Sequence, residues 1–269
     1  MNQLNFKLAN GVLIPAIGFG TWQIPDGEVA YNAVLHALKA GYRHIDTAMA
    51  YKNEESVGRA IKDFGIKREE VFITTKLPAY IKGYNETLEA FQSSLDRLGV
   101  EYIDLYLIHA PKPWGVEGDG MNYMDQNIAS WKAFEELYKR GLIRSIGVSN
   151  FGPNHLTALM KETTIVPMVN QILVNPNAIP RENILFNQKH NILIEAYSPL
   201  ATGRIFQTDR FDAIAVKYHK TVAQICIRWS YQMGFSPLPK SVTPSRIEEN
   251  LNIFDFSLTQ EDMDLIGKL

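Results

Sequence analysis

Apolar residues follow two alternating patterns along this chain. Short apolar or β-branched runs, typical of buried strands, alternate with longer segments in which apolar residues recur every three or four positions, as in amphipathic helices. Several helical segments end at a glycine, such as Gly41, Gly65 or Gly99, the residue that commonly closes a helix. The pattern predicts strands over residues 16–22, 43–46, 71–76, 102–109, 143–148, 167–172, 192–197 and 236–238, and helices over residues 28–39, 54–64, 86–98, 125–140, 153–160, 181–189, 221–232, 245–252 and 259–268.

This alternation of strands and helices predicts an α/β fold built on a parallel sheet with crossover helices. Eight strand–helix units in 269 residues favour a closed (β/α)8 TIM barrel, a single domain over residues 1–269. A doubly wound open sheet is the alternative, but no G-x-G-x-x-G fingerprint opens a helix. Asn10-Gly11, between two short apolar runs, predicts an N-terminal β-hairpin that plugs one end of the barrel.

Composition and charge exclude several classes of function. The chain is 46% hydrophobic with a formal net charge of −2, so no basic excess indicates a nucleic-acid or membrane-surface partner. Its one cysteine, Cys226, permits no internal disulfide, which fits a reducing compartment. The first residues lack a signal-peptide pattern and no apolar run approaches the ~18 residues of a membrane span. We therefore expect a cytoplasmic protein.

Ionisable residues come at the same end of three consecutive predicted strands. Asp46, Lys76 and His109 end the second, third and fourth strands, and Tyr51 follows in the loop after the second. In a barrel, these strand ends lie side by side at the face that carries catalytic residues. A phenol has a pKa near ~10, and a neighbouring ammonium such as that of Lys76 would favour phenolate and lower this pKa. Asn53 is placed to cap the helix that begins at residue 54.

Each of these residues also has an ordinary structural interpretation. Asp46 alone is consistent with a turn cap, Lys76 with a solvated loop residue, and His109 and Tyr51 with half-buried structural side chains. Four such groups at matched topological positions make a catalytic interpretation about as good as the structural one. Spacing alone leaves both open.

The sequence contexts of these four residues resemble those of a known family. R-H-I-D-T-A-M-A-Y around Asp46 and Tyr51, T-K-L at Lys76 and D-L-Y-L-I-H before His109 are similar to the catalytic tetrad of the aldo-keto reductases, notably the prokaryotic type. G-F-G-T-W, G-V-S-N-F, N-Q, A-Y-S-P-L and P-K-S-V-T-P-S-R-I-E-E-N follow in the order found in that family. The resemblance covers nearly the whole chain and implies a barrel that binds NADPH (or NADP+) without a Rossmann domain.

The resemblance implies roles for individual residues. Tyr51 would protonate a carbonyl oxygen as hydride arrives, Lys76 and Asp46 would tune Tyr51, and His109 would orient the carbonyl. Substrate would contact Trp22, Tyr51, His109 and Trp114, and no metal is implied. The implied cofactor-binding residues are Gly20, Thr21, Trp22, Asp46, Ser149, Asn150, Gln171, Tyr197, Ser198, Leu200, Lys240, Ser241, Val242, Arg246, Glu249 and Asn250.

The segment over residues 240–250 also has properties of a phosphate site in its own right. Thr243-Pro244 reads as a helix start, and a helix N-terminus favours phosphate. Lys240 and Arg246 add two cations, and arginine can clamp a phosphate with paired donors. In isolation the segment is better explained as a solvated, charged first turn of a helix. The resemblance places the 2′-phosphate of NADPH here.

The chain departs from the family pattern in three places. N-Q-I-L-V-N-P stands where the family often has N-Q-x-E-Y-H-P, so that Val174 and Asn175 indicate altered local packing. Ala110-Pro111 follows His109 in place of Trp-Pro. The sequence stops at Leu269, directly after the last predicted helix. We therefore expect an open pocket that accepts several small carbonyls, dicarbonyls and keto compounds.

Two rival functions remain at this stage. A non-catalytic relative would bind nucleotide without turning over substrate, although the intact tetrad argues against it. A barrel aldolase would use Lys76 as a Schiff base and would need no nicotinamide. A monomer that acts on a small-molecule carbonyl is the expectation that the family implies.

Overall fold

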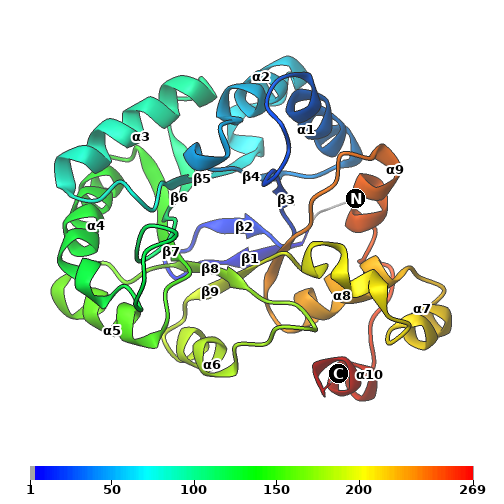
Figure 1. Ribbon diagram of the computed structural model, residues 1–269. Coiled ribbons are helices and arrows are strands. Elements are labelled where there is room, and N and C mark those ends of the chain that lie inside the picture. Colours follow the sequence, from blue (N-terminus) through cyan, green and yellow to red (C-terminus); the bar gives the residue numbers. More distant parts are fainter. Residues whose placement is uncertain (1–3, 269) are drawn as a thin grey trace.

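Eight parallel strands form the centre of the molecule (Figure 1). The computed structural model describes residues 4–268, so that expectations about the two chain ends that rest on residues 1–3 and 269 lie outside the described residues. Each strand pairs in parallel with the next along the chain. The strands are β3 (Phe19–Gly20), β4 (His44–Asp46), β5 (Phe72–Leu77), β6 (Ile103–Ile108), β7 (Ile143–Ser149), β8 (Val169–Leu173), β9 (Leu193–Tyr197) and β10 (Ser236–Leu238).

Backbone hydrogen bonds join the first and last strands of this sheet. The amide of Gly18 donates to the carbonyl of Pro237 at 3.1 Å, and the amide of Gly20 donates to that of Pro239 at 3.0 Å. The close approach depends on glycine, because a Cβ at Gly18 would lie 2.5 Å from Leu238 Cδ2. The sheet is therefore a closed barrel, which confirms the predicted (β/α)8 fold over the open alternative.

Helices surround the barrel in a ring (Figure 1). Their glycine ends are as predicted, because Gly41, Gly65 and Gly99 all have positive φ angles directly after a helix. Within residues 4–268, no helix combines the length and apolar character that a membrane span needs. The helices are α1 (Glu28–Ala40), α2 (Glu54–Phe64), α3 (Tyr84–Leu98), α4 (Met124–Lys139), α5 (Pro153–Glu162), α6 (Arg181–Lys189), α8 (Val222–Gln232), α9 (Pro244–Leu251) and α10 (Gln260–Lys268).

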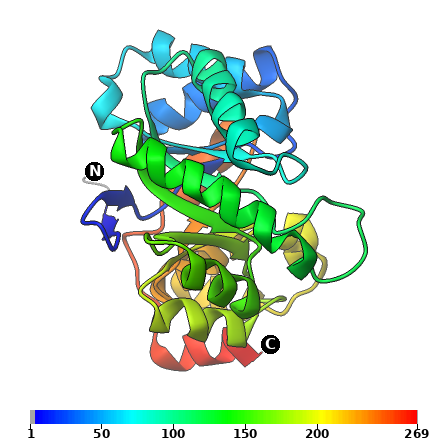
Figure 2. The ribbon, with the colours of Figure 1, turned by 90° about the vertical axis from the view of Figure 1, so that its left-hand side faces the viewer.

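The N-terminal hairpin lies across one end of the barrel, opposite the loop that follows β6 (Figure 2). Strand β1 (Asn5–Lys7) pairs antiparallel with β2 (Leu13–Pro15). At its turn, Asn10 Nδ2 donates to the carbonyl of Arg144, at the start of β7, at 2.9 Å. The hairpin therefore covers one end of the barrel, as predicted, and the structure shows that this is the end where the strands begin.

One local prediction needs correction, and two elements were not predicted. The segment after Leu200 contains an unpredicted 3-10 turn (Ala201–Gln207) and helix α7 (Asp212–Tyr218), which are too short for a clear period. Asn53 precedes α2 but does not cap it. The Asn53 Oδ1 that would cap the helix instead accepts from the Thr47 hydroxyl at 2.8 Å. The Asn53 amide donates to the carbonyls of Thr21 and Ile24, both at 3.1 Å. These long-range bonds are favoured because a buried polar group that is left without a partner is costly.

Gly58 on α2 tests how tightly the helical ring is packed. A Cβ there would overlap the carbonyl group of Leu98 on α3, so Gly58→Ala is expected to destabilise the protein by about 1–3 kcal/mol. Gly267 on α10 is the matched control, because its Cβ would meet nothing within 4 Å. Gly267→Ala should be neutral or stabilising by up to ~1 kcal/mol, since alanine favours helix. Urea denaturation measures both, and equal effects would contradict the packing argument.

Candidate active site

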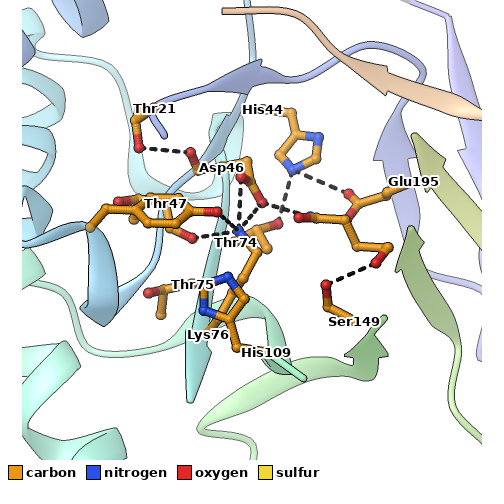
Figure 3. A network of polar contacts seen from close by, with 12 residues as sticks. Thr21, His44, Asp46, Thr47, Thr74, Thr75, Lys76, His109, Ser149 and Glu195 are labelled. Atoms are coloured by element: carbon orange, nitrogen blue, oxygen red, sulfur yellow. Dashed lines mark hydrogen bonds and ion pairs between the residues drawn. The ribbon is translucent and has the colours of Figure 1, made fainter. Parts of the chain in front are cut away.

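The four predicted tetrad residues meet at the carboxyl ends of β4, β5 and β6. Lys76 Nζ donates to both carboxylate oxygens of Asp46, at 2.8 and 2.7 Å, and to the carbonyl of Thr47 at 2.8 Å. The same ammonium lies 3.3 Å from Tyr51 Oη. Figure 3 shows Lys76 and Asp46 turned toward each other, with His109 close by. The structure thus places a held cation beside the phenol, as the spacing predicted.

Lys76 keeps its charge although it is fully buried. Burial acts to lower its pKa, but the carboxylate of Asp46 and the Tyr51 hydroxyl oppose this, and the net pKa is raised above 10.5. A buried ion pair of this kind persists only where the remaining polar atoms are also satisfied. Here the Thr47 carbonyl supplies that additional partner.

The pKa of Tyr51 departs from the sequence prediction. Burial raises it to about 12, and this effect exceeds the lowering by Lys76. The sequence predicted the sign of the Lys76 contribution but not the depth of the phenol, because burial depends on the assembled barrel. Tyr51 therefore holds its proton at neutral pH and is available to donate it.

His109, the fourth residue of the tetrad, packs against the ring of Tyr51. Burial lowers its pKa well below 6.5, helped by the charges of Lys76 and Lys82, so the imidazole is neutral. Its ring packs edge-on to Tyr51 and Trp114, with centroids 5.5 and 4.8 Å away. Among the described residues, Nδ1 has no hydrogen-bond partner. A neutral imidazole can donate one N–H to a ligand oxygen.

A further layer of buried polar groups lies behind the tetrad, of which Gln171 was predicted as a site residue and Glu195 and His44 were not. Gln171 Nε2 donates to Asp46 Oδ2 at 2.8 Å and to Glu195 Oε2 at 2.9 Å. Glu195 and His44 are fully buried, and burial raises the pKa of Glu195 to about 8 and lowers that of His44 to about 3. The available signal was a lone acid within the apolar strand L-I-E-A-Y.

A cavity of about 970 Å³ opens at the carboxyl ends of the strands, directly above the tetrad. Lys76 lies beneath this cavity rather than on its wall, and Thr21 is buried with its hydroxyl donating to the Asp46 carbonyl at 3.0 Å. The other predicted site residues line it: Gly20, Trp22, Asp46, Tyr51, His109, Trp114, Ser149, Asn150, Gln171, Tyr197, Ser198, Leu200, Lys240, Ser241, Val242, Arg246, Glu249 and Asn250.

Hydrogen bonds between side chains and backbone fix the wall next to the tetrad. Asn150 Nδ2 donates to the His109 carbonyl at 3.0 Å, and Tyr197 Oη donates to Asn150 Oδ1 at 2.9 Å. Asn175 Nδ2 donates to the Ser198 carbonyl at 3.0 Å, so this departure from the family pattern ties the loop after β8 to the cavity wall. Asn175, where the sequence indicated altered packing, therefore makes a specific hydrogen bond.

The cavity also has lining residues that the sequence did not predict. Several come from the 3-10 turn after Leu200, where Ala201 and Thr202 have positive φ angles that residues other than glycine rarely adopt. Irregular segments carry no hydrophobic period, so their placement could not be predicted. The unpredicted lining residues are Gln23, Ala50, Pro199, Thr202, Gly203, Phe206, Thr221, Ala223, Leu238, Pro239 and Thr243.

Comparison with known proteins agrees with this architecture. A profile of the Aldo/keto reductase family matches residues 16–269. The chain belongs to the aldo/keto reductase family. The glyoxal reductase of Bacillus subtilis is 46% identical to it, over 98% of this chain and 91% of that relative.

Solved aldo/keto reductase structures superimpose on it closely. An aldo/keto reductase from Brucella melitensis has a TM-score of 0.92 and 46% identity, covering 99% of both chains. A Bombyx mori aldo-keto reductase in complex with NADP has a TM-score of 0.89 and 35% identity, covering 100% of this chain and 93% of its own. This aldo/keto reductase thus shares the overall fold of solved relatives.

Glu195 should make the stability of this aldo/keto reductase depend on pH. The folded protein keeps the Glu195 proton up to about pH 8, whereas an unfolded glutamate loses it near its ordinary pKa of 4.5. The folded state therefore binds more protons within that window, and the free energy of unfolding falls as pH rises through it, by up to about 1.4 kcal/mol per pH unit.

The variant Glu195→Gln removes this titration. Its free energy of unfolding, relative to that of the unmodified protein, is expected to increase steadily between about pH 5 and about pH 8. Urea denaturation at several pH values measures the difference. A constant difference across the window would mean that Glu195 is ionised throughout.

Proposed function

We propose that this protein is an NADPH-dependent oxidoreductase that reduces aldehydes and ketones to alcohols, with Tyr51 as the general acid. The observation that carries the proposal is the Lys76 ammonium, held by Asp46 and 3.3 Å from Tyr51 Oη. A proton donor needs its conjugate base stabilised when the proton leaves. In a buried site, a fixed cation next to the developing phenolate supplies that stabilisation.

The cavity has the chemistry that a nicotinamide dinucleotide phosphate requires. Amide and hydroxyl groups line the cavity next to the tetrad, and the cations Lys240 and Arg246 line it just before and within the first turn of α9. Ser241 Oγ accepts from the Thr243 amide at 3.0 Å, so the loop entering α9 is ordered by its own side chain. The residues proposed to hold the cofactor are those predicted from the sequence that line the cavity, with Thr21 supporting the Asp46 carbonyl from behind.

The bound nicotinamide would supply a hydride, and the protein side chains would handle the proton. Tyr51 would donate its hydroxyl proton to the carbonyl oxygen of the substrate. Neutral His109 would donate a hydrogen bond to the same oxygen and so hold the carbonyl near the phenol. Lys76 would stabilise the phenolate that remains, and Asp46 would keep Lys76 in place.

The rival interpretations are less well supported by the geometry. A Schiff-base lysine must be a free amine, yet Lys76 is a charged ammonium that donates to Asp46 and Thr47. A non-catalytic nucleotide-binding protein would have no need of the Lys76–Tyr51 contact. Carbonyl-dependent consumption of NADPH separates the two, because binding alone would leave NADPH unchanged.

Small aldehydes, dicarbonyls and keto compounds are the proposed substrates. Trp22 and Trp114 line the cavity and remain 46% and 54% exposed, which leaves an aromatic but accessible mouth. Such a pocket discriminates weakly, because one methylene is worth only about 1–3 kcal/mol. The B. subtilis relative named glyoxal reductase supports a dicarbonyl substrate. We further propose that the protein is a monomer of one domain. We also propose a cytoplasmic location, because the single thiol, Cys226, forms no internal disulfide and fits a reducing compartment.

Tyr51→Phe tests the general acid. Phenylalanine keeps the ring and removes the proton, so carbonyl reduction should fall by roughly 10²–10⁴-fold. NADPH oxidation with a panel of reactive aldehydes, α-dicarbonyls and keto esters measures the loss, and titration of intrinsic fluorescence should show that NADPH still binds. Turnover above about a tenth of the unmodified rate, well outside that range, would remove Tyr51 from this role.

Arg246→Ala tests the proposed 2′-phosphate site. Loss of a charge-assisted hydrogen bond should weaken NADPH binding by roughly tenfold to a hundredfold and leave NADH binding nearly unchanged. Arg140→Ala is the matched control, since Arg140 follows α4 and does not line the cavity. An equal loss for both cofactors would show that Arg246 supports the fold or the shared part of the dinucleotide.

A further inference from the structure

The amide nitrogen of Gln171 is shared between two buried carboxyl groups. It donates to Asp46 Oδ2 at 2.8 Å and to Glu195 Oε2 at 2.9 Å. Gln171 and Glu195 are direct partners in the register between β8 and β9, whereas Asp46 reaches the same nitrogen from β4. Figure 3 shows Asp46 and Glu195 both directed into the interior of the barrel.

These two bonds fix which way the Gln171 amide faces. A primary amide nitrogen carries two hydrogens, and each is used by one carboxyl group. Rotating the amide by half a turn would place its oxygen against the Asp46 carboxylate, which can only accept, and this is unfavourable in a buried site. The oxygen of Gln171 is therefore the atom left for a ligand, and Gln171 lines the cavity.

Among the described residues, the Glu195 side chain makes no hydrogen bond other than the one it accepts from Gln171. Its side chain is fully buried, and within residues 4–268 Oε1 has no hydrogen-bond partner. His44 Nε2 lies 3.6 Å from Oε1. A buried carboxyl group with one hydrogen bond is costly relative to an apolar side chain of similar volume. A stability role alone would therefore favour a different residue at this position.

We propose that Glu195 is a positioning residue that holds the Gln171 amide with its oxygen toward the cavity, where it accepts the carboxamide N–H of the nicotinamide. The inference rests on the proposed function, because the ligand is the nicotinamide of NADPH. Glu195 thus sets which face of the nicotinamide ring is turned toward the substrate.

The charges around Glu195 support this arrangement. Asp46 and His44 face it from β4 and Lys76 from β5, and the Lys76 charge is already balanced by Asp46. Burial and the Asp46 carboxylate raise the pKa of Glu195 to about 8, so at neutral pH Glu195 is a neutral acid. It can therefore accept the Gln171 hydrogen bond without adding an unpaired charge beside Tyr51.

Glu195→Met and Glu195→Gln separate orientation from packing. Methionine matches the length of glutamate but provides no oxygen, whereas glutamine restores an oxygen that can accept from Gln171. Binding is measured by fluorescence titration with NADP+ and with 2′,5′-ADP, which carries the phosphate end of the cofactor but lacks nicotinamide. The face of hydride transfer is measured with NADPH deuterated stereospecifically at C4 and a reactive aldehyde.

For E195M we expect NADP+ affinity to fall about three- to tenfold, the loss of roughly one hydrogen bond, while 2′,5′-ADP affinity stays unchanged. Deuterium transfer should become mixed between the two faces, and the Tm should stay the same or rise. E195Q should recover most of the NADP+ affinity and a single face of transfer.

Two results would overturn the inference. If E195M binds NADP+ as tightly as the unmodified protein and transfers from one face, Glu195 does not orient Gln171. If E195M lowers the Tm and weakens both ligands equally, its role is packing. Should the unmodified protein neither bind NADP+ nor oxidise NADPH with any carbonyl, the proposed function fails as well, which distinguishes that failure from failure of the Glu195 inference alone.

Discussion

The buried pair of Lys76 and Asp46 is the interaction on which the site depends. Taking both charges out of water is costly, and only close contacts offset this cost. Lys76 makes two such hydrogen bonds to Asp46 and one to the Thr47 carbonyl. Removing either partner would leave an uncompensated buried charge, worth about 3–5 kcal/mol. The barrel supplies the required geometry because parallel strands place their last residues at one level. Tyr51 then needs only a short turn after β4 to reach the ammonium.

The second polar layer follows from the same constraint. Asp46 has more acceptor capacity than Lys76 uses, and Gln171 donates to one of its oxygens. Gln171 in turn contacts Glu195, so the network runs across the barrel from β5 to β9. From Lys76 to Gln171 each side chain hydrogen-bonds the next, which lowers the penalty of burying polar groups, whereas Glu195 Oε1 has no partner among the described residues. Positions that would ordinarily hold apolar side chains thus organise the floor of the cavity.

The sequence predicted those features that depend on local patterns. Strand ends marked by Asp46, Lys76 and His109, and helices closed by glycine, follow from periodicity and from the rules of the barrel. The helix at residues 212–218 and the turn before it were not predicted, because they are short and irregular. The roles of Asn53 and Glu195 depend on contacts between distant segments. The pKa of Tyr51 depends on burial, which no single strand or loop determines.

The two ends of the cavity differ in how strongly a charge acts there. Lys240 and Arg246 are exposed, so their attraction for a phosphate is screened by water and salt and suits reversible binding. Lys76 is fully buried, where the same unit charge acts on Tyr51 with much less screening. The exposed cations can therefore hold a ligand without trapping it, and the buried cation can stabilise a developing phenolate. The exposed cations near α9 and the buried cation on β5 thus separate ligand binding from proton transfer within one barrel.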